Sequence, residues 1–345
     1  PHASHEIIVP NRAFTLSIGL CICMMMKVSL MSQRFLHRLP LRSKSSWHKS
    51  TLFFYLLFYC SINAQSYFAL DVDNDLYFGT DRYYSSGIFL KYGKLKTQSR
   101  DSLSYWRYAS SHWELGQEIN TPASRLTSNP DMLDYPYNGW LYIGFKQEYL
   151  HDFNFGMGWG VELGTTGSDA SFSRILQNTY HKYVLDVNEL TWVAAMPQAF
   201  HLNLKGNLMY SVPLTRKISW VQNTLLRLGT FRSSARLQTG LQYGNILGFP
   251  FFGERLESIN EGTALFLGGA LEYRMHNYAF SGSAFRENSP LDFTVQNFQT
   301  VFQLGLVYHS LDWRILTVLH VTSLDVMEQE YPRHTYLTIK ITRLF

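Results

Sequence analysis

Cysteine is almost absent from this chain, and long hydrophobic runs are missing. Its three cysteines, Cys21, Cys23 and Cys60, all precede residue 65, so the rest of the chain can form no disulfide and has no thiol chemistry. The apolar stretch at residues 51–60 is shorter than the roughly 20 residues that a membrane-spanning helix needs. A disulfide scaffold, a thiol enzyme and a helical membrane protein are therefore disfavoured.

The chain also lacks an excess of charge once its first 64 residues are set aside. Seven of the 30 basic residues and one of the 26 acidic residues precede residue 65, so the formal charge of +4 becomes about −2 for the remainder. We therefore expect no nucleic-acid partner.

The first 64 residues read as targeting sequence. Residues 1–30 resemble no folded segment and are expected to be a non-coding or mis-assigned upstream extension. Residues 31–64 have the order of a signal peptide, with a basic stretch, an apolar run and then small residues. We expect cleavage after Ala64, which leaves one domain at residues 65–345.

The chain is rich in alternating apolar and polar residues. In the last ten residues, Leu337, Ile339 and Ile341 share one face because strand side chains alternate with a period of two. A strand of an outer-membrane barrel has this pattern, and so does the last strand of a soluble sandwich.

The number of such segments favours the barrel. About twelve recur, an even number as a single-chain bacterial barrel requires, and the 22 Tyr, 24 Phe and 8 Trp suit its two aromatic girdles. We predict an all-β fold, a transmembrane antiparallel β-barrel of about 12 strands in the outer membrane, with the barrel-assembly machinery as a partner during biogenesis. The predicted strands lie near residues 66–76, 84–95, 112–121, 139–150, 153–165, 199–211, 217–229, 234–247, 262–275, 298–309, 311–322 and 334–345.

One segment breaks the alternation. Residues 169–183 carry apolar side chains from Phe172 to Tyr180 at spacings of three and four, which predicts a short amphipathic helix capped by Ser168 or Asp169. Such a helix between two strands lies in a loop. It could carry function, or it could be a lid or plug that only packs against the wall.

Two polar clusters could carry chemistry. Asp71, Asp73 and Asp75 would share one face of the first strand, where they repel one another unless a cation or bases neutralise them. Oxygen ligands favour calcium, although a solvated acidic lumen explains the same residues. On the predicted helix, Gln177 and His181 are four residues apart and share a face. A lone histidine is more often structural than catalytic.

Taken together, these motifs resemble the outer-membrane lipid A 3'-O-deacylase family. The shared patterns are Asn-Asp on the first strand, Asp-x-Tyr-[Ser/Thr]-x-Gly on the second, Pro-Tyr-x-Gly-Trp on a middle strand, and Gly-x-x-Gly-x-Asp-Ala leading to Gln-Asn-x-x-His. The detailed match covers roughly residues 66–200, while the second half agrees only in barrel character. Here the patterns read Asn74-Asp75, Asp81 to Gly87, Pro136 to Trp140, Gly164 to Ala170 and Gln177 to His181, with Trp192 also matching.

The resemblance implies an active site between the outer barrel wall and a helical extracellular loop, where an ester-linked acyl chain of lipid A, the anchor of lipopolysaccharide, is hydrolysed. In the family mechanism, calcium polarises the ester carbonyl and stabilises the oxyanion while a histidine activates water. Carried over, Asp75 and Asn74 organise the calcium site, and His181 is the general base. Gln177 orients substrate or water, and Ser85 supplies a hydroxyl that the family more often takes from threonine.

The sequence also departs from the family. Arg125 is the only candidate for a basic pair expected after the third strand, and Tyr135 replaces an arginine of the middle-strand motif. The glutamate and tyrosine expected after the histidine fall at Val187 and Glu189, so the carboxylate is expected at Asp186 or Glu189. We predict Arg125 and Glu189 as substrate-binding residues. The lost cations bear on which lipid is bound more than on hydrolysis.

Two other functions stay open beside the esterase. An outer-membrane phospholipase would use a serine nucleophile polarised by a histidine. A non-catalytic barrel, either a pore or a structural protein, could share the scaffold, because fold alone does not establish function.

Overall fold

The structure, a computed structural model, describes most of the chain from residue 65 onward. The predicted extension at residues 1–30 and the predicted signal peptide at residues 31–64 lie outside this part. The described residues are 65–98, 105–151, 154–246, 248–253, 261–285, 289–310 and 312–345.

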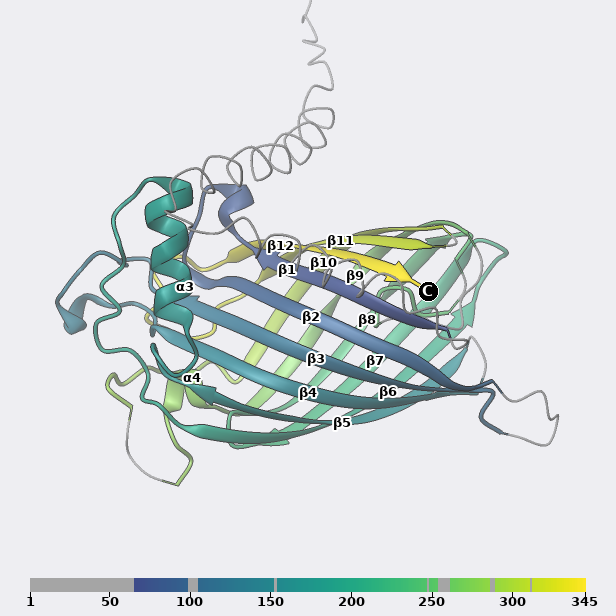
Figure 1. The fold of residues 1–345 in the computed structure, drawn as a ribbon, viewed down its shortest axis with the longest axis horizontal. Helices are drawn as coiled ribbons and strands as arrows, with labels where there is room; N and C mark the ends of the chain where they lie inside the picture. The colour runs from purple at the N-terminus through teal and green to yellow at the C-terminus, as the bar shows by residue number, and fades with distance from the viewer. Residues whose placement is uncertain are drawn as a thin grey trace, which may run out of the picture. The chain divides into compact units, whose positions relative to one another are not determined.

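Twelve antiparallel strands form a closed barrel (Figure 1). Each strand pairs with its neighbours in sequence, and the first pairs with the last, where Tyr67 lies opposite Leu344 and Asn74 opposite Leu337. The barrel prediction is therefore confirmed, and the C-terminal segment closes a barrel, not a sandwich. The strands are β1 (Ser66–Asn74), β2 (Tyr83–Gln98), β3 (Tyr108–Thr121), β4 (Asn138–Leu150), β5 (Phe155–Thr166), β6 (Phe200–Pro213), β7 (Ile218–Gly229), β8 (Arg232–Gly244), β9 (Gly262–Asn277), β10 (Phe298–His309), β11 (Trp313–Thr322) and β12 (His334–Leu344).

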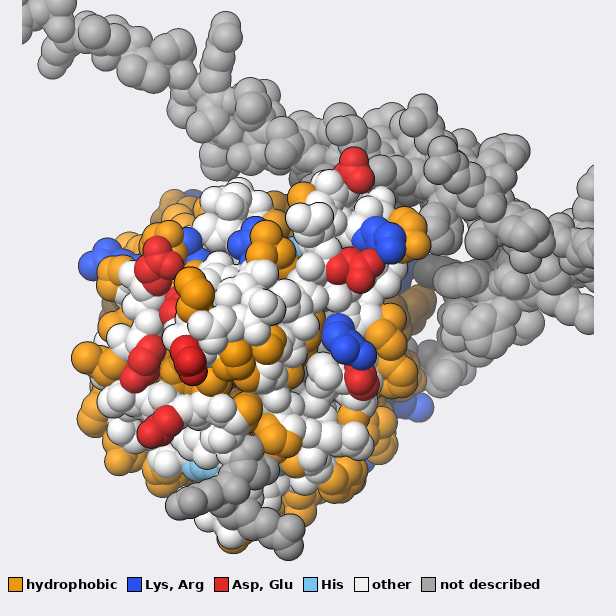
Figure 2. All heavy atoms as spheres, turned by 90° about the vertical axis from the view of Figure 1, so that its left-hand side faces the viewer, with side chains coloured by type: hydrophobic (Ala, Val, Ile, Leu, Met, Phe, Trp, Pro, Cys, Tyr) orange, Lys and Arg blue, Asp and Glu red, His pale blue; other side chains and the backbone are white. Residues whose placement is uncertain are grey.

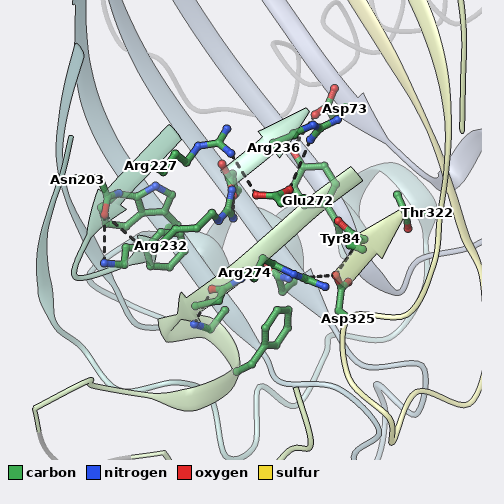
Figure 3. Close-up of a pocket in the computed structure, with 18 of the residues that line it drawn as sticks. Asp73, Tyr84, Asn203, Arg227, Arg232, Arg236, Glu272, Arg274, Thr322 and Asp325 are labelled. Atoms are coloured by element: carbon green, nitrogen blue, oxygen red, sulfur yellow. Dashed lines mark hydrogen bonds and ion pairs between the residues drawn. The ribbon is translucent and has the colours of Figure 1, made fainter. Parts of the chain in front are cut away.

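The lumen is polar and filled with paired charges. A cavity of about 360 Å³ inside the barrel is bordered by arginines and carboxylates, and Figure 3 shows Arg227 and Arg236 both reaching Glu272. Lys91 lies 2.7 Å from Asp71, and Tyr84 donates a hydrogen bond of 2.7 Å to Asp73. Bases and hydroxyls therefore neutralise the first two aspartates of β1 without a shared cation.

The loops at the two barrel ends differ in length. Those that follow β1, β3, β5, β9 and β11 are mostly long and carry the helices, whereas the chain enters and leaves the barrel at the other end, where Ser66 bonds to Phe345. Outer-membrane barrels have short periplasmic turns and longer extracellular loops, so we assign the helical end as extracellular. No helix in the described residues is long and apolar enough to cross a membrane. The short helices are η1 (Leu76–Phe78), η2 (Pro130–Met132), α3 (Ser173–Tyr180), η3 (His181–Leu185) and α4 (Tyr278–Ser281).

The predicted helix is present, but its predicted cap is wrong. α3 begins at Ser173, after Phe172, which occupies the left-handed region with φ 58° and provides no side-chain cap. Asp169 instead pairs with Arg174 at 2.8 Å, and the Ser168 carbonyl accepts from the backbone of Arg174. The turn before the helix thus replaces the cap that the sequence suggested.

Candidate active site

The residues predicted to act together lie on the outer surface of the barrel wall. Along β3, Glu118 points into the lumen, so Gln117 and Thr121, which are an odd number of residues away, point outward. α3 covers them. The Gln117 amide donates to Ser173 Oγ at 2.5 Å, and the Gln177 amide donates to Thr121 Oγ1 at 2.8 Å. The site therefore faces the lipid side of the barrel and not the lumen.

A glycine of the middle-strand motif allows the helix to approach this closely. A Cβ atom added at Gly139, on β4, would overlap the hydroxyl groups of Ser171 and Ser173 at the start of α3. Only glycine leaves room for this contact. The Pro-Tyr-x-Gly-Trp motif therefore serves to seat α3 on the wall.

His181 is buried at the junction of α3 and the wall. The residue is 3% exposed, and its Nε2 lies 2.8 Å from Oδ2 of Asp81, which is 5% exposed. The Arg125 guanidinium lies on the other side of Asp81, with Nε 3.4 Å from Oδ2 and Nη1 donating to the Asp81 carbonyl at 3.2 Å. Nδ1 of His181 has no hydrogen-bond partner among the described residues. One imidazole nitrogen is thus held by a carboxylate, and the other is available for chemistry.

A chain of hydrogen bonds connects β2 to the helix. Ser85 Oγ lies 2.9 Å from Thr121 Oγ1, which also accepts from Gln177. Ser85 makes a second, longer contact of 3.4 Å to the Ile119 carbonyl. Ser85 and Gln177 therefore meet through Thr121, a residue that the sequence analysis did not select.

Other predicted residues lie elsewhere. Glu189 pairs with Lys182 at 2.8 Å, and both side chains are more than half exposed. Asp186 is also exposed. The carboxylate beside the histidine is Asp81, which the Asp-x-Tyr motif contained but to which no role was given. Tyr135 donates to Asp325 at 2.9 Å and borders the lumen cavity, so it supplies nothing to the outer site.

Asp75 is buried next to this constellation. Its Oδ2 accepts from Thr80 Oγ1 and from the backbone of Arg82, each at 3.0 Å, and these two residues flank Asp81 in sequence. Its Oδ1 has no partner among the described residues. Burial raises the pKa of Asp75 to about 7, and the Asp81 charge adds to that rise against the hydrogen bonds.

These oxygen atoms suit a hard cation. Asp75 Oδ1 and Gln177 Oε1 are both buried without a partner in the described part of the chain, and carboxylate and amide oxygens are the ligands that calcium prefers. Asn74 Oδ1 accepts from the Leu76 backbone at 2.7 Å and so shapes the turn that carries Asp75. The described residues contain no cluster of three or more His, Cys, Asp or Glu, so neutral oxygens would have to complete such a site.

The fold and site define an outer-membrane β-barrel that carries a polar, histidine-containing site on its outer wall beneath a loop helix. Residues 51–345 match the outer membrane protein LpxR family, and the chain belongs to that family. The predicted membership of the lipid A deacylase barrels and the predicted outer-membrane location are thereby confirmed.

Two solved structures share the barrel. LpxR from Salmonella typhimurium is 15% identical, with a TM-score of 0.66 over 81% of this chain and 100% of that one. The β domain of the Bordetella autotransporter BrkA is 10% identical, with a TM-score of 0.44 over 82% of this chain and 99% of that one. No curated protein matches the sequence. At these identities, the structural likeness supports the fold, while the family rests on the sequence match.

Proposed function

We propose that this protein is a calcium-dependent lipid A deacylase, a carboxylic ester hydrolase that removes an ester-linked acyl chain of lipid A in the outer leaflet. Family membership and a site on the lipid side of the wall support the proposal. The observation that carries it is the buried pair of His181 and Asp81, 2.8 Å apart, because a histidine oriented by a carboxylate is suited to activate water.

In this proposal His181 is the general base. Asp81 keeps the proton on Nε2, so Nδ1 accepts a proton from water as the water oxygen attacks the ester carbonyl carbon. The bond to the leaving oxygen then breaks, and that oxygen takes the proton back from the imidazolium. The products are a fatty acid and a hydroxyl group on the glycolipid. Gln177 would orient the substrate or the water.

Asp75 would hold the cation, with Asn74 shaping its turn. Bound calcium supplies a positive charge that polarises the ester carbonyl and stabilises the oxyanion. Arg125, which contacts Asp81, would help to orient that carboxylate and could meet an anionic group of the substrate.

The contacts of Ser85 do not favour a serine nucleophile. Its hydroxyl bonds to Thr121 and to the Ile119 carbonyl, whereas a phospholipase of that kind needs its serine bonded to the catalytic histidine.

Purified protein in detergent micelles with lipid A tests the proposal. We expect fatty-acid release to require calcium and to fall about 10²–10⁴-fold in His181→Ala, since general-base catalysis contributes on that scale. Asp75→Ala should lose the calcium dependence together with the activity. His151→Ala, just beyond β4 at the opposite end of the barrel, is the matched control and should keep full activity. Normal release from folded His181→Ala would reject the proposal.

A further inference from the structure

The helix α3 has its polarity reversed relative to a helix that packs on a core. The three residues that face the wall are polar: Ser173, Gln177 and His181 are all buried. Phe172 and Ile175 are 59% and 58% exposed. Contact with the barrel therefore accounts for the polar face of α3 but not for its apolar side chains.

The apolar exposure continues past the helix. We name it the apolar stripe. Every member is at least 40% exposed, in a loop that water would be expected to favour with polar residues. The members of the apolar stripe are Phe172, Ile175, Leu176, Tyr183, Val184 and Val187.

The apolar stripe adjoins the lipid-facing surface of the barrel. Ser173 accepts from Gln117, and the next outward residue along β3 is Leu115, which is exposed and lies opposite the exposed Ile143 of β4. Two residues of a strand span roughly 7 Å, so α3 begins about that far from the lipid-facing row. In Figure 1, α3 crosses the extracellular ends of the strands and does not run along them. Seen from that end, apolar side chains gather around the rim (Figure 2).

The remaining sector of the helix is polar and basic. At about 100° per residue, Arg174 and Asn178 lie between the wall-facing sector and Ile175, and Lys182 follows on the same side. Arg174 and Lys182 are about half exposed and pair only with exposed carboxylates. A helix that lies in a membrane interface combines an apolar sector with a basic polar sector in this way.

We propose that the apolar stripe is a membrane-contact surface whose partner is the acyl-chain region of the outer leaflet. α3 and η3 lie in the plane of the leaflet, with the polar face on the barrel, the apolar stripe against lipid and the cations toward the head groups. Continuity with the lipid-facing surface favours lipid over a second copy of the chain. The proposal concerns the position of the helix, so it does not depend on the proposed catalysis.

Site-directed fluorescence tests this placement. The full chain, with its three cysteines replaced by serine, carries one environment-sensitive label at Ile175→Cys or at Lys182→Cys. These two sites have similar exposure on the same segment. The probe is phosphatidylcholine with brominated acyl chains in proteoliposomes, and iodide is the aqueous quencher. Leu115→Cys in the lipid-facing row and Leu214→Cys in the exposed β6–β7 turn are the lipid and water references.

We expect the Ile175 label to lose fluorescence to brominated lipid as strongly as the Leu115 label does. The Lys182 label should respond to iodide, as the Leu214 label does. Quenching of the Ile175 label by iodide alone would overturn the proposal, and protection from both quenchers would show that protein, such as a second copy, covers the stripe. If Ile175→Cys fails to fold, judged by heat-modifiable mobility, Tyr183→Cys provides the same comparison.

Discussion

His181 has two nitrogen atoms in different surroundings. Asp81 lies beside Nε2, and Nδ1 has no partner among the described residues. The carboxylate fixes which nitrogen carries the proton and leaves the other as the acceptor. The orientation of the base therefore depends on a residue about one hundred positions away in sequence.

At this scale we predict that Asp81→Asn lowers the rate of deacylation by about 10³-fold or more, since loss of the orienting carboxylate favours the wrong tautomer. The measurement is fatty-acid release by the purified, folded variant. Asp169→Asn is the control, because that carboxylate makes only an exposed pair with Arg174. A rate for Asp81→Asn equal to that of the control would contradict the assigned role.

The sequence allowed part of this site to be predicted. Gln177 and His181 could be placed on one buried face because helical spacing determines that relation. The expectation for the carboxylate partner was wrong, since it was sought near His181 in the chain at Asp186 or Glu189. Contacts between β2 and a loop helix depend on the tertiary fold, which no local spacing encodes.

The seating of α3 on the barrel wall is the main device at the level of elements. Polar contacts to Gln117 and Thr121 hold the helix, and Gly139 provides the space beneath it. Because His181 follows directly after α3, any shift of the helix moves the base relative to Asp81.

We predict that Gly139→Ala abolishes most of the activity without preventing barrel assembly. The added methyl group would collide with Ser171 and Ser173 and displace α3 from the wall. Gly144→Ala, on the same strand, is the matched control, because a Cβ atom there comes no closer than 3.7 Å to its neighbours. Activity and limited proteolysis of the α3 loop are the measurements. Equal behaviour of the two variants would argue against this account of the motif.

The strands were more predictable than the helix boundary. Period-two alternation gave bounds close to those observed, such as β10 at Phe298–His309, because one face meets lipid along the whole strand. The start of α3 escaped prediction because the left-handed Phe172 has no side-chain signature. The exposure of its apolar side also reverses the pattern expected for a helix packed on a core.

For the whole molecule, the lumen and the outer wall have separate roles. Paired charges such as Arg232 with Glu118, at 3.1 Å, fill the extracellular half of the lumen. An apolar cluster lies within the barrel between strands and the β8–β9 turn. Its buried members are Leu150, Met209, Val221, Phe249, Phe252 and Phe266.

We therefore predict that the purified barrel forms no ion-conducting pore. Ion pairs and aromatic side chains inside a twelve-stranded barrel leave cavities and not an aqueous channel. Planar-bilayer recordings with heat-modifiable, folded protein should show a baseline without steps. Stepwise conductance that survives repeated purification would support the pore alternative.

The central claim is that His181 on the outer wall removes an acyl chain from lipid A. Mass spectrometry of lipid A from cells that express either the native chain or His181→Ala tests it most directly, with folded barrel in both membranes verified by heat modifiability. The account predicts lipid A that has lost one acyl unit with the native chain and unmodified lipid A with the variant. Identical spectra, with both barrels folded and calcium present, would contradict it.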